Sequence, residues 1–371
     1  MPLKVLISGG GTGGHIFPAI AIANTIKELR PDTEFLFVGA NGKMEMEKVP
    51  SAGYDIIGLN ITGIQRQLSM SNLAFPFKLV LSLLSARAII RGFRPNVVVG
   101  VGGYASGPVL RMATWMRVPS LIQEQNSFAG ITNRWVAGSV NKACVAYDGM
   151  EKFFPKERII KTGNPVRQNV VQIQGKREAA IEKCGFIADK PVLLILGGSL
   201  GARSINLAMA HQVGELLKAG IQVLWQTGKL FSEETERLKR QYANEALVIA
   251  DFIYEMDGAY AAADFVVSRA GAIAVSELSL IGKPTILVPF PFAAEDHQTK
   301  NAMALVETDA AIHVADKEVM TALIPEILKL NADKALQKTL GQNMLKHGMP
   351  NAAIDIANEV IKLGSGKVDS L

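Results

Sequence analysis

The chain has little cysteine, few aromatic residues and no apolar run long enough to cross a bilayer. Its 371 residues include only two cysteines, Cys144 and Cys184, and aromatic residues make up 6% of the composition. Two cysteines provide neither a disulfide framework nor a thiolate metal site, which is typical of proteins from a reducing compartment. The scarcity of aromatic residues and the lack of a recognised module argue against nucleic acid as a partner. The N-terminus also lacks the pattern of an export signal.

Acidic residues are missing from residues 56–123, although the net charge of the whole chain is only +5. An apolar and basic segment such as this one can lie on an anionic membrane surface, where each cation contributes about 1 kcal/mol. The alternative is a buried core helix with solvated arginines, and the sequence leaves both open. The interval contains the apolar run LAFPFKLVLSLL at 73–84 and the cations Arg66, Lys78, Arg87, Arg91, Arg94, Arg111 and Arg117.

The most informative stretch is SGGGTGGH at residues 8–15, which contains five glycines. The apolar run at 4–7 before it predicts a buried parallel strand, and residues 16–23 after it predict a helix with Pro18 in the first turn. Glycines let backbone N–H groups approach an oxyanion, and a helix N-terminus adds about half a positive charge. We therefore expect an anion-binding loop here, with phosphate as its ligand.

Three further motifs are absent, and each absence argues against one class of ligand site. A dinucleotide site needs a carboxylate at the end of the second strand, but the strand expected at 34–38 runs into Gly39, Ala40 and Asn41. A P-loop needs Lys and Ser or Thr after the last glycine, and these residues are missing. The chain also contains no Asp-x-Asp, the motif with which many sugar transferases hold a metal. We expect no metal and no cofactor.

Strands, glycine loops and helices alternate along the whole chain, which predicts an α/β fold with parallel sheets. The second half repeats the opening theme, with a strand at 191–196, a glycine loop at 197–201 and a helix start at 202–206. This repetition predicts two doubly wound, Rossmann-like domains facing across a cleft, with ligands at the carboxyl ends of the strands. We expect domains at 1–164 and 165–348, a helix at 349–363 crossing back to the first domain, and a disordered tail at 364–371.

A third loop, within residues 263–277, predicts the nucleotide site. A strand should end at Ser268, and a helix should begin near Ala272 with an N-terminus that can bind a diphosphate. Glu277 follows about one turn later, within reach of ribose hydroxyls, unless it is a solvated helix charge. Gln298 and Asn301 share a helix face and can bind sugar hydroxyls, unless they are surface polar groups.

The ordered set of motifs resembles the MurG family of peptidoglycan glycosyltransferases over residues 3–361. The resemblance implies a GT-B fold and an inverting hexosyltransferase that moves N-acetylglucosamine from UDP-GlcNAc to lipid I to give lipid II. It also implies a peripheral protein on the cytoplasmic face of the bacterial inner membrane, with cell-wall synthesis proteins as possible partners. The motifs are GTGGH (11–15), GGY (102–104), EQN (124–126), GNPVR (163–167), GGS-x-GAR (197–203), A-x-x-VSE (272–277) and DHQ (296–298).

Matching motifs carry the donor contacts of that family over to this chain. Two departures bear on them: Gln123 stands where the family commonly has His, and residues 291–295 vary, which affects the contacts on the sugar side. The implied donor-binding residues are Thr12, Gly13, Gly14, Asn126, Arg167, Ser199, Ile253, Ala272, Ile273, Ala274, Val275, Ser276, Glu277 and Gln298.

An inverting transfer must remove a proton from the acceptor hydroxyl and stabilise departing UDP. His15 is the first candidate for the base because its intrinsic pKa suits the task. It can instead donate to the acceptor diphosphate or be a structural histidine, and Glu124 is the second candidate base. Backbone donors, a helix dipole and Arg167 would stabilise UDP. We expect the acceptor at Gly11, His15, Gly103 and Tyr104.

Three other functions share this architecture. A UDP-GlcNAc epimerase would act on the nucleotide sugar without an acceptor. A Rossmann dehydrogenase would bind NAD, and a non-catalytic subunit would hold UDP-GlcNAc without releasing UDP. Incubation with labelled UDP-GlcNAc, with and without a lipid I analogue, separates these functions.

Overall fold

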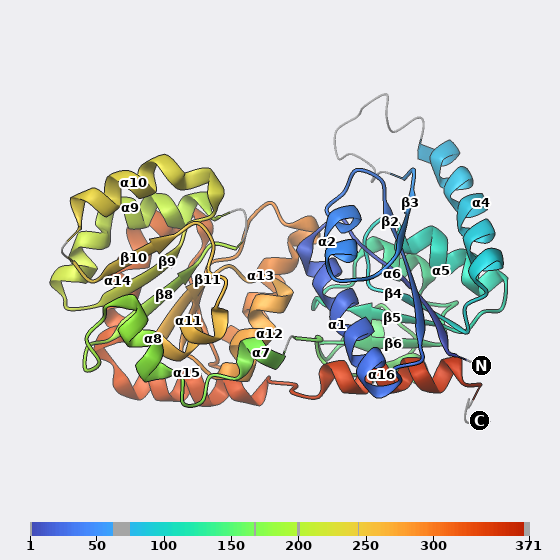
Figure 1. Ribbon diagram of the computed structural model, residues 1–371. Helices are drawn as coiled ribbons and strands as arrows, with labels where there is room; N and C mark the ends of the chain where they lie inside the picture. The colour runs from blue at the N-terminus through green and yellow to red at the C-terminus, as the bar shows by residue number, and fades with distance from the viewer. Residues whose placement is uncertain (1, 62–74, 167, 199–200, 244, 367–371) are drawn as a thin grey trace. The chain divides into compact units, whose positions relative to one another are not determined.

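The protein is described by a computed structural model that covers residues 2–61, 75–166, 168–198, 201–243 and 245–366 (Figure 1). The chain forms two compact units. Unit 1 comprises residues 1–166 and 350–371, and unit 2 comprises residues 167–349. Arg66, Arg167, Ser199 and most of the expected tail lie outside the described residues.

Unit 1 is built on a seven-stranded sheet in the order β3-β2-β1-β4-β5-β6-β7, and every neighbouring pair is parallel. Its elements are β1 (Lys4–Ser8), α1 (Gly13–Leu29), β2 (Glu34–Ala40), α2 (Glu45–Ser51), β3 (Ile56–Leu59), α4 (Phe75–Phe93), β4 (Val97–Gly100), α5 (Ser106–Trp115), β5 (Ser120–Glu124), α6 (Ile131–Val136), β6 (Lys142–Val145), the short helices η1 (Met150–Lys152) and η2 (Lys156–Arg158), β7 (Ile159–Lys161) and α16 (Ala352–Gly364).

Unit 2 is built on a six-stranded parallel sheet in the order β10-β9-β8-β11-β12-β13. Its elements are α7 (Gln168–Val171), α8 (Arg177–Cys184), β8 (Val192–Leu196), α9 (Arg203–Lys218), β9 (Gln222–Gln226), η3 (Lys229–Phe231), α10 (Ser232–Gln241), β10 (Leu247–Ala250), α11 (Met256–Ala262), β11 (Phe265–Ser268), α12 (Ala272–Ile281), β12 (Thr285–Leu287), η4 (Ala294–Asp296), α13 (His297–Val306), β13 (Ile312–His313), η5 (Asp316–Glu318), α14 (Val319–Ala332) and α15 (Lys334–Lys346).

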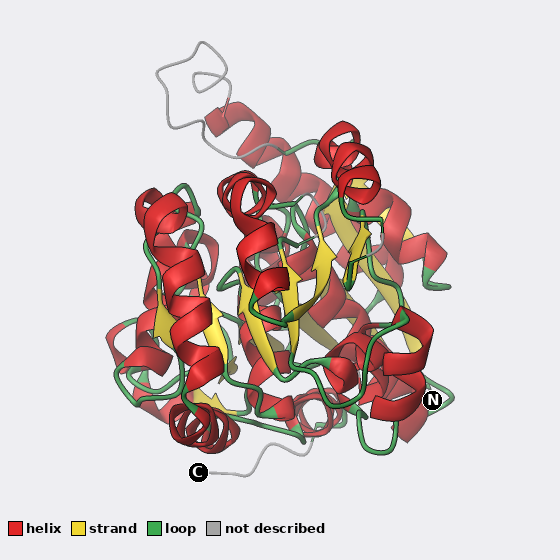
Figure 2. Cartoon of the chain, turned by 90° about the vertical axis from the view of Figure 1, so that its left-hand side faces the viewer, coloured by secondary structure: helices red, strands yellow, loops and turns green. Residues whose placement is uncertain are grey.

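Both sheets are covered by helices on their two faces, as Figure 2 shows. The central strands are therefore buried on both sides, which is why they read as continuous apolar runs in the sequence. Each sheet reverses its winding once, between β1 and β4 in unit 1 and between β8 and β11 in unit 2. The loops that follow these four strands lie where doubly wound sheets bind ligands. The expected α/β fold with two parallel, doubly wound sheets is confirmed.

Helix α16 comes from the end of the chain but belongs to unit 1, where it packs against α1 (Figure 1). Its inner face carries Ile356 and Val360, which share a core with Val5 and Ile22. Burial of one such side chain contributes about 1.5–3 kcal/mol. The helix ends at Gly364, where a side chain would collide with Leu3.

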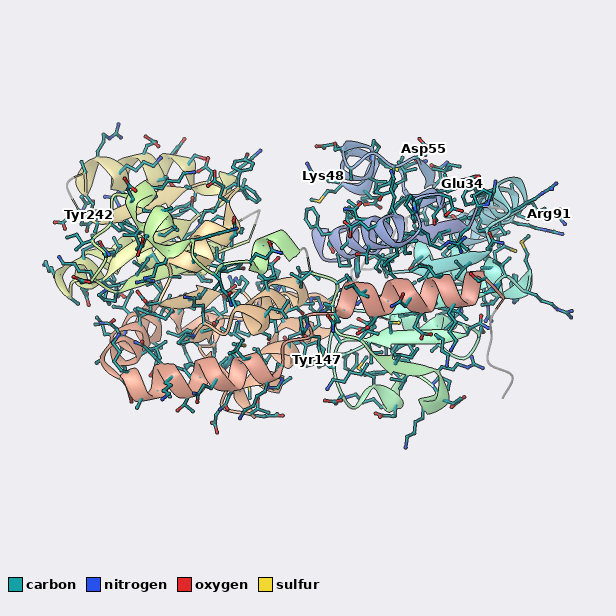
Figure 3. The ribbon with its side chains drawn as sticks, turned by 60° about the horizontal axis from the view of Figure 1, so that its bottom comes forward. Glu34, Lys48, Asp55, Arg91, Tyr147 and Tyr242 are labelled. Carbon is teal, nitrogen blue, oxygen red and sulfur yellow. The ribbon has the colours of Figure 1, made fainter. Side chains whose placement is uncertain are left out.

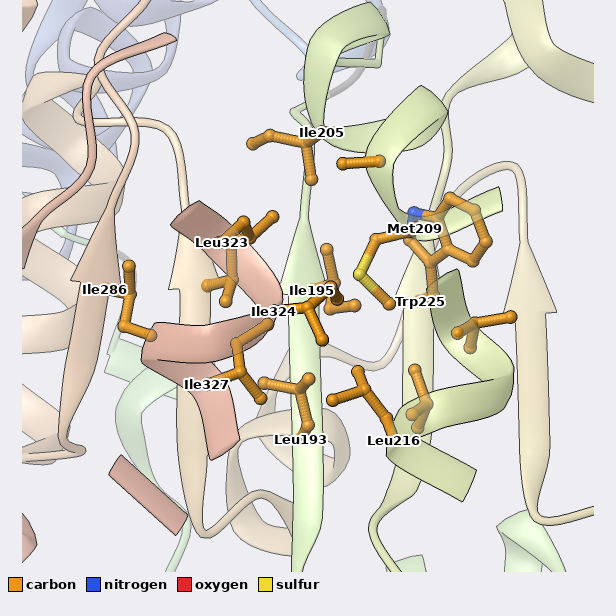
Figure 4. Close-up of a cluster of buried hydrophobic side chains, with 14 of the residues drawn as sticks. Leu193, Ile195, Ile205, Met209, Leu216, Trp225, Ile286, Leu323, Ile324 and Ile327 are labelled. Carbon is orange, nitrogen blue, oxygen red and sulfur yellow. The ribbon is translucent and has the colours of Figure 1, made fainter. Parts of the chain in front are cut away.

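The core of unit 2 lies between its sheet and helices α9 and α14 (Figure 4). Leu193 and Ile195 of β8 and Trp225 of β9 point into it and meet Met209 of α9 and Leu323 of α14. The indole nitrogen of Trp225 donates to the side-chain oxygen of Asn206, 3.2 Å away, so its buried polar atom is satisfied. This packing anchors β8 and β9, whose carboxyl ends lead into the expected donor loops.

Two details of the first loop differ from the sequence prediction. Helix α1 begins at Gly13, three residues before the expected start at Ile16, so Pro18 lies in the second turn and not the first. The glycines themselves form the first helical turn. The sequence analysis also placed no strand at β3, β6, β7 or β13, because these edge or short strands have two to four residues and weak apolar patterns.

Candidate functional site

The glycine loop between β1 and α1 divides its backbone N–H groups into two sets. The amides of Gly9 and Gly10 donate to the carbonyls of Val38 and Gly102, both at 3.3 Å. The amides of Thr12, Gly13 and Gly14 make no hydrogen bond to the described part of the chain. These three groups lie at the N-terminus of α1, where the helix dipole favours an anion. The expected donor residues of this loop are therefore able to bind an oxyanion.

Gly11 is different from its neighbours because its amide is already occupied. It donates to Oε2 of Glu45, 2.9 Å away. The backbone of Gly11 is exposed, but its N–H group faces the protein. This amide cannot also donate to the acceptor, because an amide that donates to a carboxylate has no second proton to give. Contact of the acceptor with another part of Gly11 stays a prediction.

The loop after β4 packs directly on the glycine loop. Gly103 has φ of +85°, and a side chain there would place Cβ 2.3 Å from the carbonyl oxygen of Gly10. Only glycine permits this approach. Tyr104 follows with 51% of its surface exposed, so it is available at the same edge of the sheet. Gly103 therefore allows the two loops to pack closely. Of the two residues expected to bind the acceptor here, only Tyr104 has a side chain that could contact it.

His15 lies in the first turn of α1, with its ring beside Gly102. Its Nδ1 is 3.0 Å from the carbonyl oxygen of Gly10 and 3.3 Å from Oγ1 of Thr12. A carbonyl oxygen can only accept, so Nδ1 carries the proton in this arrangement. Nε2 then holds the lone pair, which is the state that a general base requires.

Glu124 ends β5 and is 1% exposed. One carboxylate oxygen accepts from the amide of Asn126 at 3.0 Å, and the other accepts from the amide of Gly130 at 3.0 Å and from Nδ2 of Asn133 at 2.8 Å. Burial raises the pKa of Glu124, whereas these hydrogen bonds lower it. Both oxygens are engaged with the loop, so the geometry argues against Glu124 as the base and gives it the task of holding Asn126.

Gln123, the position where the resembled family commonly has His, is a structural residue in this chain. It is fully buried, and its Nε2 donates to Oδ1 of Asn164 at 2.9 Å. Asn164 in turn donates to the carbonyl of Gln125 at 3.0 Å. These amides connect β5 to the segment that ends unit 1, and they leave Gln123 no exposed atom for a ligand.

In unit 2, β11 and α12 form the expected strand, turn and helix start. Strand β11 ends at Ser268 and α12 begins at Ala272, as predicted. The amides of Ala272, Ile273 and Ala274 make no hydrogen bond to the described residues, and Gly271 accepts from Val275. The turn therefore presents three donors at a helix N-terminus. Ser276 is less available, since its hydroxyl donates to the carbonyl of Ala272 at 2.9 Å.

Glu277 is half-buried on α12, and its Oε2 accepts from the hydroxyl of Tyr260 at 2.8 Å. Tyr260 lies on α11 and is 1% exposed. The tyrosine hydroxyl thereby fixes one carboxylate oxygen of Glu277. Sequence reasoning found Glu277 but missed Tyr260, because nothing in the local pattern relates α11 to α12.

Gln298 and Asn301 share a face of α13 but have different environments. The side-chain oxygen of Gln298 accepts from the amide of Phe290 at 2.9 Å, which leaves its NH₂ group to meet a ligand. Asn301 is fully buried and donates to the carbonyl of Ala270 at 3.3 Å. We therefore correct the expectation that Asn301 binds sugar hydroxyls. It supports the turn before α12.

Ile253 uses its amide within unit 2. The amide donates to Oε1 of Gln226 at 2.9 Å, and Nε2 of the same glutamine donates to the carbonyl of Gly198 at 3.1 Å. Gln226 is a buried residue at the carboxyl end of β9, and the sequence analysis missed it. It joins two of the expected donor loops and leaves the carbonyl of Ile253 for a ligand.

Arg269 is a third residue that the sequence analysis missed, although it directly precedes the turn. Its side chain is 12% exposed and bonds Asp316 at 2.5 Å, Oγ of Ser204 at 2.9 Å and the carbonyl of Val288 at 3.0 Å. The guanidinium thereby ties the turn before α12 to β12, α9 and η5. Its partners are up to 65 residues away in the chain, so no local pattern could identify them.

The helix pair α4 and α5 carries an unusual surface. The buried side of α4 includes Ala86 and Ile90, whereas its outer side exposes Phe77, Val80 and Leu84 by 55–69%. A hollow of about 410 Å³ lies between the two helices, lined by residues that include Leu84, Arg87 and Trp115. One side of this run is therefore core and the other is exposed, and its contact with a membrane stays a prediction. Among the described helices, none has the length and apolar content needed to cross a membrane.

Cations surround this apolar surface. Arg87 and Arg91 lie one turn apart on α4, and Arg91 points away from the ribbon in Figure 3. The guanidinium of Arg111 lies over the rings of Trp115 and Trp135, 5.4 and 5.6 Å from their centroids. We call this set the α4–α5 patch: Phe77, Val80, Leu81, Leu84, Trp115 and Trp135 with Arg87, Arg91 and Arg111.

Comparisons with known proteins agree with this geometry. The model of the glycosyltransferase family 28 N-terminal domain matches residues 5–145, and that of the family 28 C-terminal domain matches residues 192–356. The matched ranges include the glycine loop of unit 1 and the turn before α12 of unit 2. Both halves of the chain are thus accounted for by one family.

The chain is similar over nearly its full length to individual proteins. A Bacteroides fragilis protein named UDP-N-acetylglucosamine--N-acetylmuramyl-(pentapeptide) pyrophosphoryl-undecaprenol N-acetylglucosamine transferase is 54% identical and covers 97% of this chain and 96% of its own. The crystal structure of Acinetobacter baumannii MurG has 28% identity and a TM-score of 0.78, covering 97% of this chain and all of that one. A UDP-GlcNAc 2-epimerase from Neisseria meningitidis, at 13% identity and TM-score 0.65, covers 98% of this chain and all of its own, and shares the fold alone.

Proposed function

This chain belongs to glycosyltransferase family 28, and from that premise we propose that it transfers N-acetylglucosamine from UDP-GlcNAc to lipid I, giving lipid II. The observation that carries the proposal is the 54% identity over 97% of the chain to a transferase of that name. Unbonded amides at the N-termini of α1 and α12 support it, because an enzyme with two diphosphate substrates needs two anion sites.

We assign the donor to unit 2 and the acceptor to unit 1. The amides of Ala272, Ile273 and Ala274 would bind the UDP diphosphate, and Glu277 would accept from its ribose hydroxyls. Arg167 and Ser199 are expected to add to this site, and both lie outside the described residues. In unit 1, the amides of Thr12, Gly13 and Gly14, which the resemblance assigns to the donor, would also contact the acceptor diphosphate. Tyr104 offers the acceptor its exposed ring.

The reaction inverts the configuration at the anomeric carbon. The acceptor hydroxyl oxygen attacks C1 of GlcNAc as its proton passes to Nε2 of His15. The bond between C1 and the phosphate oxygen breaks, and its electron pair leaves with UDP. Amides aimed at this oxygen would stabilise the developing charge, and loss of one such donor typically costs about 10²–10³ in rate.

His15 supports this scheme through its hydrogen bonds. The Gly10 carbonyl keeps the proton on Nδ1, so Nε2 can accept a proton without a change of tautomer. The other role expected for His15, donation to the acceptor diphosphate, would require a proton on Nε2. The pH dependence of kcat separates the two roles, since a base is active above its pKa and a donor below it.

We propose further that the α4–α5 patch attaches the enzyme to the anionic membrane surface that contains its acceptor. The exposed side chains of Phe77 and Leu84 would enter the interface, and Arg87 and Arg91 would meet lipid head groups. Sedimentation with vesicles of phosphatidylglycerol and phosphatidylcholine tests this. We expect binding that weakens as salt increases, and binding insensitive to Leu84→Glu would contradict it.

The activity is tested with labelled UDP-GlcNAc, with and without a soluble lipid I analogue. We expect UDP release and a disaccharide product only when the analogue is present. Formation of a 2-epimer without acceptor would support the epimerase instead. Binding of UDP-GlcNAc without UDP release would indicate a non-catalytic subunit, and an EDTA-treated sample run in parallel tests the expectation that no metal takes part.

A further inference from the structure

A buried carboxylate lies directly behind the glycine loop. Glu45, the first residue of α2, is 1% exposed. Its Oε1 accepts from the amide of Ala40 at 3.0 Å, and its Oε2 accepts from the amide of Gly11 at 2.9 Å. Among the described residues no cation is paired with it. A carboxylate buried with only backbone partners is costly to maintain, which calls for a role.

The backbone around this carboxylate is shaped to admit it. A side chain at Gly10 would place Cβ 2.1 Å from Oε1 of Glu45, and one at Gly39 would place it 2.5 Å from Cγ. Two glycines, one in the loop after β1 and one on β2, thus leave the space that this side chain fills. The carboxylate occupies the end of the second strand, where a dinucleotide site would use an acidic residue for the ribose, but it faces the loop.

The peptide group between Gly10 and Gly11 connects Glu45 to His15. Its N–H, from Gly11, donates to Glu45, and its C=O, from Gly10, lies 3.0 Å from Nδ1 of His15. The described part of the chain contains no cis peptide bond, so the N–H and C=O of this group point in opposite directions. Glu45 and His15 therefore lie on opposite sides of one peptide group and are hydrogen-bonded to its two ends.

We propose that Glu45 is a positioning residue that orients His15 and increases its basicity through the intervening peptide group. The inference rests on the proposed role of His15 as the base. A carboxylate that accepts from the N–H shifts electron density toward the carbonyl oxygen, because linked hydrogen bonds polarise one another. The more negative oxygen holds Nδ1–H more firmly and stabilises the imidazolium that forms when Nε2 takes the proton.

The arrangement is related to the carboxylate–histidine pair of a catalytic triad, with a peptide group placed between the two side chains. Glu45 is a charged side chain that is hydrogen-bonded directly to the backbone of this loop. The other charged or titratable side chains on the neighbouring elements are Lys27 and Glu28 at the far end of α1, Lys43, Glu47 and Lys48 around α2, Tyr104 after β4 and Arg111 on α5.

The test compares Glu45→Gln with Glu47→Gln. Both substitutions remove one negative charge from α2, but Glu47 is 76% exposed and contacts Lys48. The pKa and tautomer of His15 are measured by nitrogen-15 NMR of histidine-labelled protein, with the signal assigned from a His15→Ala sample. We expect Glu45→Gln to lower the pKa of His15 by about 0.5–1 unit, less than a directly contacting charge would. Glu47→Gln should leave it unchanged.

Activity gives the second measurement. In Glu45→Gln, kcat should fall about tenfold, a small part of the 10²–10⁴ that a general base is worth, and its acidic limb should move to lower pH. The affinity for UDP should stay the same. Loss of activity with an unchanged His15 pKa would mean that Glu45 only shapes the loop, and the proposal would be wrong.

Two outcomes keep this inference separate from the proposed function. If the His15 pKa shifts in Glu45→Gln but His15→Ala turns over normally, the relay exists and the assignment of the base is wrong. If Glu45→Gln does not fold, the tautomer of His15 in the unmodified protein still tests the proposal. The proposal requires neutral His15 to carry its proton on Nδ1. A neutral tautomer protonated on Nε2 would overturn it.

Discussion

Units 1 and 2 have the same central strand order, yet they equip their helix N-termini differently. In unit 1, the loop before α1 contains a histidine, a buried carboxylate partner and three unbonded amides. In unit 2, the turn before α12 presents three amides, and Glu277 lies on α12, more than one turn after its first residue. The supports also differ: Glu45 holds the first loop, whereas Arg269 and Asn301 hold the second.

This difference indicates a division of tasks. A base must be held in one tautomer and must tolerate a positive charge, so a negative group behind the loop of unit 1 is useful there. A site for a departing diphosphate needs only positive potential, and a buried carboxylate behind the loop would weaken it. Behind the turn of unit 2 lies an ion pair instead, formed by Arg269 and Asp316. Under the proposed function, unit 1 would combine anion binding with proton transfer, whereas unit 2 would only bind an anion.

The strongest test of this division is His15→Ala. We expect turnover to fall by about 10²–10⁴ because the general base is lost, with the affinity for UDP nearly unchanged. Steady-state rates and calorimetric titration with UDP measure the two quantities. His211→Ala, on the exposed surface of α9, is the matched control. Normal turnover of His15→Ala would remove the contrast between the units.

Glu277→Gln should affect binding of the donor, and not proton transfer. Loss of a charged acceptor for the ribose hydroxyls should weaken UDP-GlcNAc binding by about 10- to 150-fold, corresponding to 1.5–3 kcal/mol. Tyr260→Phe removes only the hydroxyl that fixes this carboxylate and should have a smaller effect. Glu307→Gln, exposed at the end of α13, is the control. An unchanged affinity in titrations would place the nucleotide elsewhere.

A third prediction concerns a feature that both units share, a glycine with positive φ that packs closely on a neighbouring loop. Gly103 and Gly201 have φ of +85° and +83°, and a side chain would place Cβ 2.3 and 2.1 Å from backbone oxygens. Gly103→Ala and Gly201→Ala should therefore each destabilise the protein by about 1–3 kcal/mol. Gly92→Ala, on α4 with open space around it, should be neutral or slightly stabilising. Thermal melting curves decide, and equal midpoints for the three variants would contradict the steric argument.

Sequence reasoning succeeds in this molecule where the signal is local. Apolar runs followed by glycines identify β1, β8 and β11, because a parallel strand buried on both faces needs an uninterrupted apolar sequence. The same logic places α12 at Ala272. The sequence predicts the start of α1 three residues too late. Gly13 and Gly14 have poor helix propensity, and only the surrounding packing makes them helical.

The residues that hold the two loops in place could not be predicted from the sequence, because they contact partners that are distant in the chain. Glu45 is 34 residues from Gly11, and Arg269 is 47 from Asp316. Glu124 shows the converse. Its motif makes it a candidate base, whereas its burial and the four hydrogen bonds that it accepts argue for a structural role. Residue type and spacing indicate which groups face a ligand, but not which of them are already bound to the protein.

The smallest effect is expected where the surfaces of the units differ. Helix α4 exposes apolar side chains beside Arg87, whereas α10 of unit 2 exposes ion pairs such as Glu236 with Lys239. Arg87→Gln should weaken binding to anionic vesicles by about fivefold, since one cation near such a surface is worth about 1 kcal/mol. Arg240→Gln makes the same charge change on exposed α10 and should have no effect. The two variants should converge at high salt, because screening removes the contribution of Arg87 and leaves that of Leu84 and Trp115. Equal losses from both substitutions would show that net charge, and not the α4–α5 patch, attracts the protein to the vesicles.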